Sequence, residues 1–408
     1  MKALLHYIWK YRIFPHRLLQ TTGGATIEIL NNGNERPDIF EDAHLMIDGK
    51  EERGDITFCI TGSGADKAIL NISATEEACP IPTLKIVPTA ETIAIFQSIQ
   101  NGFRPCSDTL PESSTLHMGN FLSRLLAERM EEKAARITRL HNLSEKRWEE
   151  TLFRLLARNF GFGIQGDAFE EWAKVLNLSA LGKHRDNPLQ TEAIFFGQAG
   201  LLEEESIPEY YRAEALGTPY YTNLRNEYKF LKAKFGLAQT PHTLWTGTTP
   251  HTRIARLAAM YHSGKISLSH IADCTTLEAV RNLLQTPAGS YWDKHNQFGG
   301  TEINNRATTL SNKHLNLLTI NTIIPILYTY GKHRSDTTLC NRAEDFLYSL
   351  PPEENSIIRS WAKTGIIAKS AADTQALIQL KNQYCKKNRC LECLFAYQCI
   401  KESMGHKS

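Results

Sequence analysis

The first ninety residues alternate between short apolar runs and turn-forming residues. The runs are rich in β-branched residues and are separated by glycine-, asparagine- and aspartate-rich turns, which is typical of strands. They are ATIEIL (25–30), AHLMID (43–48), DITFCIT (55–61), KAILNIS (67–73) and PTLKIV (82–87). Before them, the apolar residues between Leu4 and Trp9 fall on one helical stripe. The pattern predicts a small, mostly antiparallel sheet domain over residues 1–100.

From residue 119 onward, apolar residues recur at three- and four-residue steps, the spacing of one face of an α-helix. Helices are predicted near 119–141 and 145–160, and again at 191–202, 224–236, 252–262, 315–331 and 371–385. GFRPCSDTLPESS (102–114) indicates a linker before them. The predicted fold class is therefore α+β, with a large all-α domain over 115–384 and a cysteine-bearing tail over 385–408.

The longest apolar stretch, LNLLTINTIIPILYTYG (315–331), contains Asn321 and Pro325. A membrane span needs about 18 cleaner apolar residues, so this segment predicts a buried helix. Glu192 and Gln198 also lie in an apolar helical segment, where we expect them to be buried and hydrogen-bonded. The N-terminus MKALLHYIWKYRIF lacks a small-x-small cleavage site, so no signal peptide is expected and a cytoplasmic location follows.

Composition and charge narrow the function classes only slightly. The 408 residues carry a net charge of +2, so no strong overall field draws nucleic acid or a membrane surface. Local clusters of cations matter more. Residues 381–408 hold six lysines and arginines against Glu392 and Glu402, which suits either contact with phosphate or a solvated basic tail. Arg147, Arg154 and Arg158 share one helical stripe, for which a solvated face paired with nearby glutamates is the ordinary explanation.

The segment YCKKNRCLECLFAYQC (384–399) places four cysteines close together. We expect a metal held by Cys385, Cys390, Cys393 and Cys399. A [4Fe–4S] cluster would take one thiolate per iron, and zinc, the alternative, would take four thiolates tetrahedrally. A third interpretation is an amphipathic helix with buried thiols and no metal. The cysteines outside the tail have no local partners and are expected to be small core residues.

Motifs spread over nearly the whole chain add a further expectation. They include LLHYIWKYRIF (4–14), PDIFEDAHLMIDG (37–49), WEETLFRLLARNFGF (148–162), TEAIFFGQAGLL (191–202), YKFLKAKFGL (228–237), YWDKHNQF (291–298), INTIIPILYTYG (320–331) and DTQALIQLKNQYC (373–385). In combination they resemble an uncharacterised bacterial domain-of-unknown-function family. The resemblance implies an N-terminal region similar to the PD-(D/E)xK, restriction-endonuclease-like nuclease core. It also implies a tail with three cysteines, which correspond to Cys385, Cys390 and Cys393.

The nuclease resemblance can be followed residue by residue. A PD-(D/E)xK site would hold Mg²⁺ with Asp38 and with an acidic residue on the next strand. Where the family pattern resembles V-E-I-H, this chain has Ile-Thr-Phe-Cys at 56–59, so Thr57 replaces the acid and Cys59 the basic residue. Asp55 lies on the same strand face as Thr57, and its side chain is about 7 Å along the strand from the position of the replaced acid. We therefore expect a degenerate site, with Mg²⁺ only if Asp38 and Asp55 form an active one.

The sequence predicts a protein that binds nucleic acid or a nucleic-acid-processing partner without strong hydrolysis of its own. One alternative is an active metal-dependent nuclease that uses Asp38 and Asp55. The other is a structural or interaction protein whose metal only connects the last helices.

Overall fold

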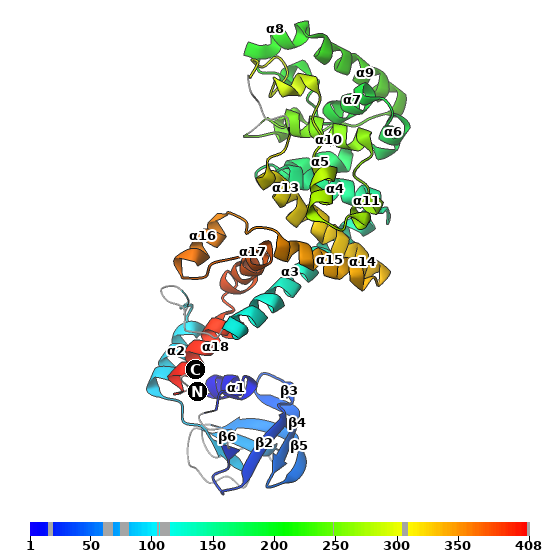
Figure 1. Ribbon diagram of the computed structural model, residues 1–408. Helices are drawn as coiled ribbons and strands as arrows, with labels where there is room; N and C mark the ends of the chain where they lie inside the picture. The colour runs from blue at the N-terminus through cyan, green and yellow to red at the C-terminus, as the bar shows by residue number, and fades with distance from the viewer. Residues whose placement is uncertain are drawn as a thin grey trace. The chain divides into compact units, whose positions relative to one another are not determined.

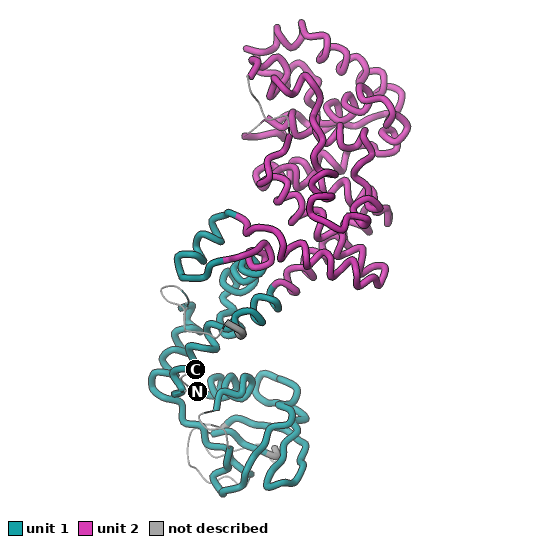
Figure 2. Tube along the Cα trace, in the orientation of Figure 1, with its two compact units in different colours: residues 1–125, 354–367, 376–408 teal, residues 126–353, 368–375 magenta. Residues whose placement is uncertain are grey.

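The structure is a computed structural model that describes residues 1–14, 19–59, 68–73, 81–103, 106, 115–247, 249–303 and 309–405. The side chains at 59, 68–69 and 115–117 lie outside this description, as does much of the predicted linker at 102–114. Two compact units make up the chain (Figure 2). Unit 1 comprises residues 1–125, 354–367 and 376–408, and unit 2 comprises residues 126–353 and 368–375. The architecture is α+β, as predicted (Figure 1).

Unit 1 contains a seven-stranded sheet with the order β1-β2-β4-β5-β6-β7, while β3 pairs with β4. The strands are β1 (Leu19–Gln20), β2 (Thr26–Asn31), β3 (Asn34–Glu35), β4 (Ile39–Ile47), β5 (Lys50–Cys59), β6 (Ala68–Ser73) and β7 (Thr83–Lys85). The pairs from β1 to β5 are antiparallel, and β5–β6 and β6–β7 are parallel. Each of the five segments with alternating apolar residues contains a strand within its described residues, so that part of the sequence prediction is confirmed.

A bulge interrupts β4 between Phe40 and Ala43, where two residues oppose Asp55 of β5. Asp42, in the bulge, has a φ of 54°, a left-handed conformation that aspartate tolerates better than most residues. The bulge keeps Phe40 and Ala43 on the same sheet face, because it shifts the register by one residue. That face is the apolar one.

Three helices share one apolar core with the sheet, and α1 lies against the strands (Figure 1). The helices are α1 (Lys2–Lys10), α2 (Ala90–Gln100) and α18 (Leu394–Ser403). Ile8 and Trp9 of α1 are fully buried, and Ile400 of α18 belongs to the same apolar core. Thr89 Oγ1 accepts the backbone N–H of Thr92 at the start of α2. Residues 385–405, within the segment predicted as a separate tail, therefore belong to the core of unit 1.

Unit 2 is helical in its described residues. Its elements are α4 (Trp148–Phe160), α5 (Gly166–Val175), α6 (Leu178–Lys183), α7 (Pro188–Gln198), η1 (Glu204–Ser206), α8 (Glu209–Gly217), α9 (Pro219–Phe235), η2 (His242–Leu244), α10 (His251–Ser263), α11 (Leu268–Asp273), α12 (Leu277–Leu284), η3 (Ser290–Asp293), α13 (Asn312–Leu318), η4 (Thr319–Ile323), α14 (Ile324–Arg334) and α15 (Thr337–Ser349). Elements that belong to both units or to the later part of unit 1 are α3 (Thr115–Leu143), α16 (Ser356–Lys363) and α17 (Ala371–Gln379).

Helices α7 and α9 approach closely because α7 carries a glycine at the crossing. A Cβ atom added at Gly197 would lie 2.2 Å from the ring of Tyr228. The next residue, Gln198, is fully buried, and its side-chain amide donates to Val175 O and Ala238 O while its oxygen accepts Asn177 N–H. The expected burial and hydrogen bonding of Gln198 are thus confirmed, and this amide connects three parts of unit 2.

The apolar segment at 315–331 forms α13, the π-helix η4 and α14 in succession. Pro325 lacks the N–H that would bond Asn321 O in a regular α-helix. Asn159 Nδ2 donates to that oxygen instead (2.8 Å), and Lys133 Nζ donates to Ile320 O (3.2 Å). Within the described residues, no helix is long and apolar enough to cross a membrane.

Candidate functional site

Three of the four tail cysteines lie where helical pieces begin or end. Cys385 ends the π-helix η5 (Leu380–Cys385), Cys390 begins η6 (Cys390–Glu392), and Cys393 immediately precedes α18. These three side chains are buried in unit 1, whereas Cys399, inside α18, is half-buried. Among these four cysteines, Cys385, Cys390 and Cys393 are therefore the ones shielded from water.

A fifth cysteine reaches this group from much earlier in the chain. The Cys106 thiol is hydrogen-bonded to the Cys385 thiol. Cys106 also lies near enough to Cys393 and Cys399 to disfavour their ionisation. We call Cys106, Cys385, Cys390, Cys393 and Cys399 the five-cysteine set. The sequence analysis placed Cys106 among the scattered core cysteines, because nothing adjacent to it in the sequence indicates a thiol partner.

Three cysteines of the five-cysteine set, Cys385, Cys393 and Cys399, lie where the neutral thiol is favoured. The hydrogen bond with Cys106, together with burial, raises the pKa of Cys385. Burial raises the pKa of Cys393 to about 12, although the backbone N–H groups of Phe395 and Ala396 at the start of α18 favour its thiolate. Burial likewise raises the pKa of Cys399 to about 11. Thiolates in this environment need a compensating cation, and metal binding releases the thiol protons.

Tyr7 of α1 places a hydroxyl group beside the thiols. Its Oη is buried and has no hydrogen-bond partner among the described residues. Burial raises the pKa of Tyr7, and Tyr11, Cys393 and Cys399 add to the rise. A buried hydroxyl without a partner is uncommon, and a thiolate or an inorganic sulfide would accept its hydrogen bond. Within the described residues, no three His, Cys, Asp or Glu side chains lie close enough together to hold a metal ion.

A cavity of about 530 Å³ in unit 1 opens next to Cys393, and we call it the tail pocket. Three cations and three aromatic rings line it, namely Lys10, Arg12, Arg124, Tyr11, Phe121 and Tyr397. The Tyr11 and Tyr397 ring centroids are 6.0 Å apart, and the two planes are tilted. Glu392 is the acidic residue of the lining and pairs with Arg389. The lining therefore carries more positive than negative charge.

The cations of the tail pocket are held in place by neighbouring groups. Lys10 Nζ lies 2.6 Å from Glu35 Oε2, and Arg12 Nε donates to Asn32 Oδ1 (2.7 Å). The guanidinium of Arg124 lies over an aromatic ring of the pocket, 5.3 Å from the centroid. Arg12 Nη1 also donates to Ile29 O (3.3 Å), so within the described chain this guanidinium uses two of its five N–H groups.

The two carboxylates considered for a nuclease site lie apart. Asp38 directly precedes β4, and its Oδ1 is 3.1 Å from Lys2 Nζ of α1. Asp55 lies on β5, and its Oδ1 accepts the backbone N–H of Asp42 at the β4 bulge (3.2 Å). Both carboxylates thus have local structural partners, and the structure does not bring them together at one place.

Thr57, the residue that the sequence analysis compared with a nuclease acid, begins a buried polar row across the sheet. It pairs with Ile39 of β4 and with Asn71 of β6, which pairs in turn with Thr83 of β7. Because Ile39 pairs with Thr57, the preceding aspartate is roughly 10 Å from Asp55 along the strands. Thr57 Oγ1 and Asn71 Oδ1 are buried without hydrogen-bond partners in the described chain. This face offers a hydroxyl and an amide where Mg²⁺ prefers carboxylates, and the Cys59 side chain lies outside the described residues.

One protein family matches most of the chain. Its model, described as protein of unknown function (DUF2851), matches residues 2–66 and 64–356. The chain belongs to this family. The DUF2851 match confirms the resemblance to a domain-of-unknown-function family; it includes Asp38 and Cys106 and ends before the tail cysteines. No curated protein and no solved structure matches the chain.

Sequence reasoning missed the residues that reach the tail from elsewhere. Cys106, Tyr7 and Arg124 are distant from the tail in the sequence, and no spacing rule connects them to it. One signal was available for Tyr7. It lies on the buried stripe of α1, where a hydroxyl requires a partner.

Proposed function

We propose that this DUF2851 protein binds single-stranded nucleic acid at the tail pocket, beside a metal held by cysteine thiolates, and does not hydrolyse it. The tail pocket carries the proposal, because cations and aromatic rings line the same open cavity. Proteins that bind single strands combine positive charge along the backbone with rings on which bases stack. A cavity of about 530 Å³ accommodates an unpaired base with its sugar, whereas bases within a duplex stay stacked out of reach.

The proposed ligands of the metal are Cys106, Cys385, Cys390 and Cys393. Cys106 takes the place that the sequence analysis gave to Cys399, because the Cys106 thiol is hydrogen-bonded to the Cys385 thiol. A [4Fe–4S] cluster is the leading candidate, and zinc is the alternative. Hydrogen bonds to ligand sulfur tune such centres, and the N–H groups at the start of α18 together with the Tyr7 hydroxyl would supply them.

The N-terminal sheet is proposed to be a degenerate relative of the PD-(D/E)xK nuclease core. Thr57 supports this, since it replaces an acid and its hydroxyl is buried without a partner in the described chain. In this proposal Asp38 and Asp55 hold no Mg²⁺. Incubation of the protein with labelled oligonucleotides and Mg²⁺ or Mn²⁺ should give no cleavage. Cleavage that disappears in Asp38→Ala would instead support an active nuclease.

Fluorescence anisotropy with labelled single-stranded DNA and RNA tests the binding proposal. We expect binding at low salt that weakens as salt rises, because cations of the pocket displace counterions from phosphates. Arg124→Met should weaken binding and lower the salt slope by about 1. Lys363→Met is the matched control, because Lys363 is exposed on α16 of unit 1 and does not line the pocket. Undetectable binding, or equal loss in the two variants, contradicts the proposal.

Anaerobic purification followed by elemental analysis and visible absorption tests the metal. Iron with acid-labile sulfide identifies an iron–sulfur cluster, and zinc without colour identifies the alternative. Cys106→Ser should lower the metal content as strongly as Cys390→Ser does, while Cys399→Ser retains it. A protein that contains no metal after anaerobic purification, or Cys106→Ser protein with full metal content, would be evidence against this ligand set.

A purely structural role of the metal is the second candidate, and the packing of the tail favours it. Cys390 belongs to the core of unit 1 together with Ile400 and Met404 of α18. If the metal only stabilises this core, Cys390→Ser lowers the melting temperature while oligonucleotide binding of the folded protein remains unchanged. If the tail pocket depends on the metal, binding falls together with the metal content.

A further inference from the structure

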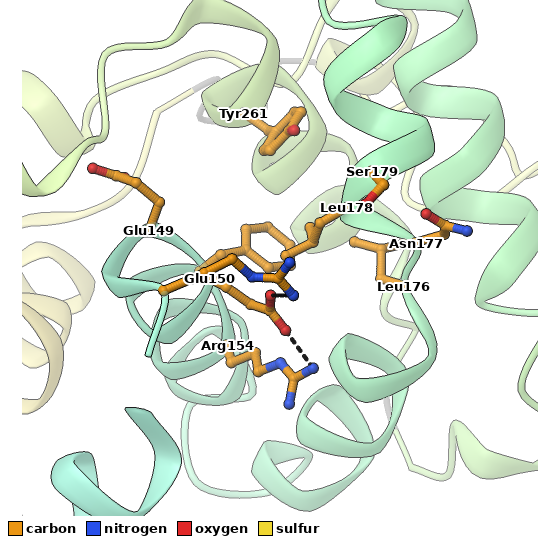
Figure 3. Close-up of a pocket in the computed structure, with 10 residues that line it drawn as sticks. Glu149, Glu150, Arg154, Leu176, Asn177, Leu178, Ser179 and Tyr261 are labelled. Carbon is orange, nitrogen blue, oxygen red and sulfur yellow. Dashed lines mark ion pairs between the residues drawn. The ribbon is translucent and has the colours of Figure 1, made fainter. Parts of the chain in front are cut away.

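Unit 2 contains a cavity of about 430 Å³ that has no part in the proposed function (Figure 3). The first turn of α4, the start of α6 and Tyr261 of α10 surround it. We call it the α4 cavity. A second cavity of about 370 Å³ shares Glu149, Phe153 and Tyr261 with it. Ligand sites for small molecules commonly have volumes of about 300 to 1,000 Å³.

A buried carboxylate holds two arginines at one wall of the α4 cavity. Glu150 is 8% exposed, and it pairs with Arg147 Nη2 and Arg154 Nη2, both at 2.5 Å. Figure 3 shows Glu150 and Arg154 with the ion pairs as dashed lines. The three residues share one face of α4, because they are spaced by three and four residues. The stripe of arginines noted in the sequence is therefore partly buried rather than fully solvated.

The arginine donors are only partly used within the protein. Arg154 Nε is buried and has no hydrogen-bond partner among the described residues. Arg147 also pairs with Glu145, but at 3.5 Å and with a largely exposed carboxylate, which contributes little. A buried donor without a partner is uncommon in folded proteins and indicates a missing small molecule or water. The two guanidinium groups thus form a preorganised place for an anion.

The remaining walls provide apolar contact and hydroxyl groups. Phe153 and Leu176 line the cavity with apolar side chains. Neither Tyr261 Oη nor Ser179 Oγ makes a hydrogen bond in the part of the chain that the structure describes, and burial raises the pKa of Tyr261. Glu149 Oε1 accepts Leu268 N–H at 3.0 Å, which fixes this carboxylate at the junction of the two cavities.

We propose that the α4 cavity binds a nucleoside monophosphate. Arg147 and Arg154 bind the phosphate, because planar guanidinium groups match phosphate oxygens in pairs. Glu149 accepts hydrogen bonds from the sugar hydroxyls, and Tyr261 and Ser179 bind polar edges of the base over the apolar wall. A cationic ligand is disfavoured, because both oxygens of Glu150 are already paired with arginine.

Isothermal titration of the full-length protein with the four common nucleoside 5′-monophosphates tests the proposal. We expect at least one to bind, and the corresponding nucleoside and inorganic phosphate each to bind at least tenfold more weakly. Arg154→Met should lower the affinity at least tenfold. Lys174→Met is its control, because Lys174 is exposed on α5 and does not line the cavity.

Arg154→Met leaves the buried carboxylate of Glu150 with one partner fewer and so lowers the stability of the protein. A second variant is therefore needed that tests the site without removing an ion pair. Tyr261→Phe removes only a hydroxyl group that has no hydrogen-bond partner among the described residues, and it should weaken binding of the monophosphate severalfold in a folded protein. Arg124→Met, in unit 1, should leave monophosphate affinity unchanged, which separates this site from the tail pocket. The proposal is overturned if no monophosphate binds, if inorganic phosphate binds equally well, or if neither Arg154→Met nor Tyr261→Phe changes the affinity.

Discussion

Glu192 of α7 is a half-buried acid whose ionisation should control the stability of unit 2. Its Oε2 accepts the hydroxyl of Tyr220 at 2.8 Å, and that hydroxyl accepts Trp292 Nε1–H at 2.8 Å. Burial raises the pKa of Glu192 to about 7, although the hydrogen bond from Tyr220 opposes the rise. The carboxyl group is therefore about half protonated in the folded protein at neutral pH.

The size and sign of the effect follow from the two pKa values. In the unfolded chain the carboxyl group regains its usual pKa of 4.5. Between pH 4.5 and about 7 the folded protein holds a proton that the unfolded chain releases, so its free energy of unfolding falls as pH rises. Each pH unit of this window lowers the free energy of unfolding by about 1.4 kcal/mol, giving a total of about 3 kcal/mol. Above the window this contribution is constant.

Glu192→Gln isolates the contribution, because glutamine cannot ionise and its amide oxygen still accepts from Tyr220. Urea denaturation followed by fluorescence should find the variant about 3 kcal/mol more stable than the wild type at about pH 8, and close to it at about pH 5. Glu205→Gln, which changes an exposed glutamate of η1, is the control and should follow the wild-type profile. If Glu192→Gln loses as much stability as the wild type between these pH values, the reasoning is refuted.

Three further results are expected. Gly197→Ala should lower the free energy of unfolding by about 3 kcal/mol in urea denaturation, because the new methyl group meets the Tyr228 ring. Unchanged stability would contradict the close approach of α7 and α9. Burial lowers the pKa of Lys133 from 10.5 to about 7. From pH 7 to about pH 9 the unfolded chain therefore holds a proton that the folded protein has released, so the free energy of unfolding of unit 2 should rise with pH. Lys133→Met should abolish that rise in the same assay. If the proposed metal is present, its removal by a chelator should make the residues after Tyr384 more sensitive to limited proteolysis, whereas an unchanged cleavage pattern would mean that no metal orders them.

Local pattern was enough to predict most elements of the fold. The strands at 26–31 and 68–73 follow from their alternating side chains, and α4 follows from apolar residues at helical spacing. The burial of Gln198 followed from one polar residue among apolar ones. The short strands β1 and β3 were missed, because two residues carry no periodicity and pair only through the neighbouring strand.

The candidate sites were harder to predict, because they combine residues that are far apart in the sequence. The tail cysteines were found from their spacing, but Cys106 joins Cys385 only through the folding of unit 1. Arg147 and Arg154 were interpreted as a solvated face. Periodicity alone cannot show which side of an amphipathic helix a second element covers, and here Glu150 between them is buried.

The contribution of α18 to the core around α1 has a consequence for synthesis on the ribosome. Translation delivers about 5 to 20 residues per second, so the first helix emerges about 20 to 80 s before Ile400 can join it. Throughout that interval the nascent N-terminal sheet presents an incomplete apolar surface. Unit 2 has no such delay, because almost all its residues are contiguous. We therefore expect unit 2 to fold during elongation, and the N-terminal sheet to require chaperone protection until α18 has emerged from the ribosome.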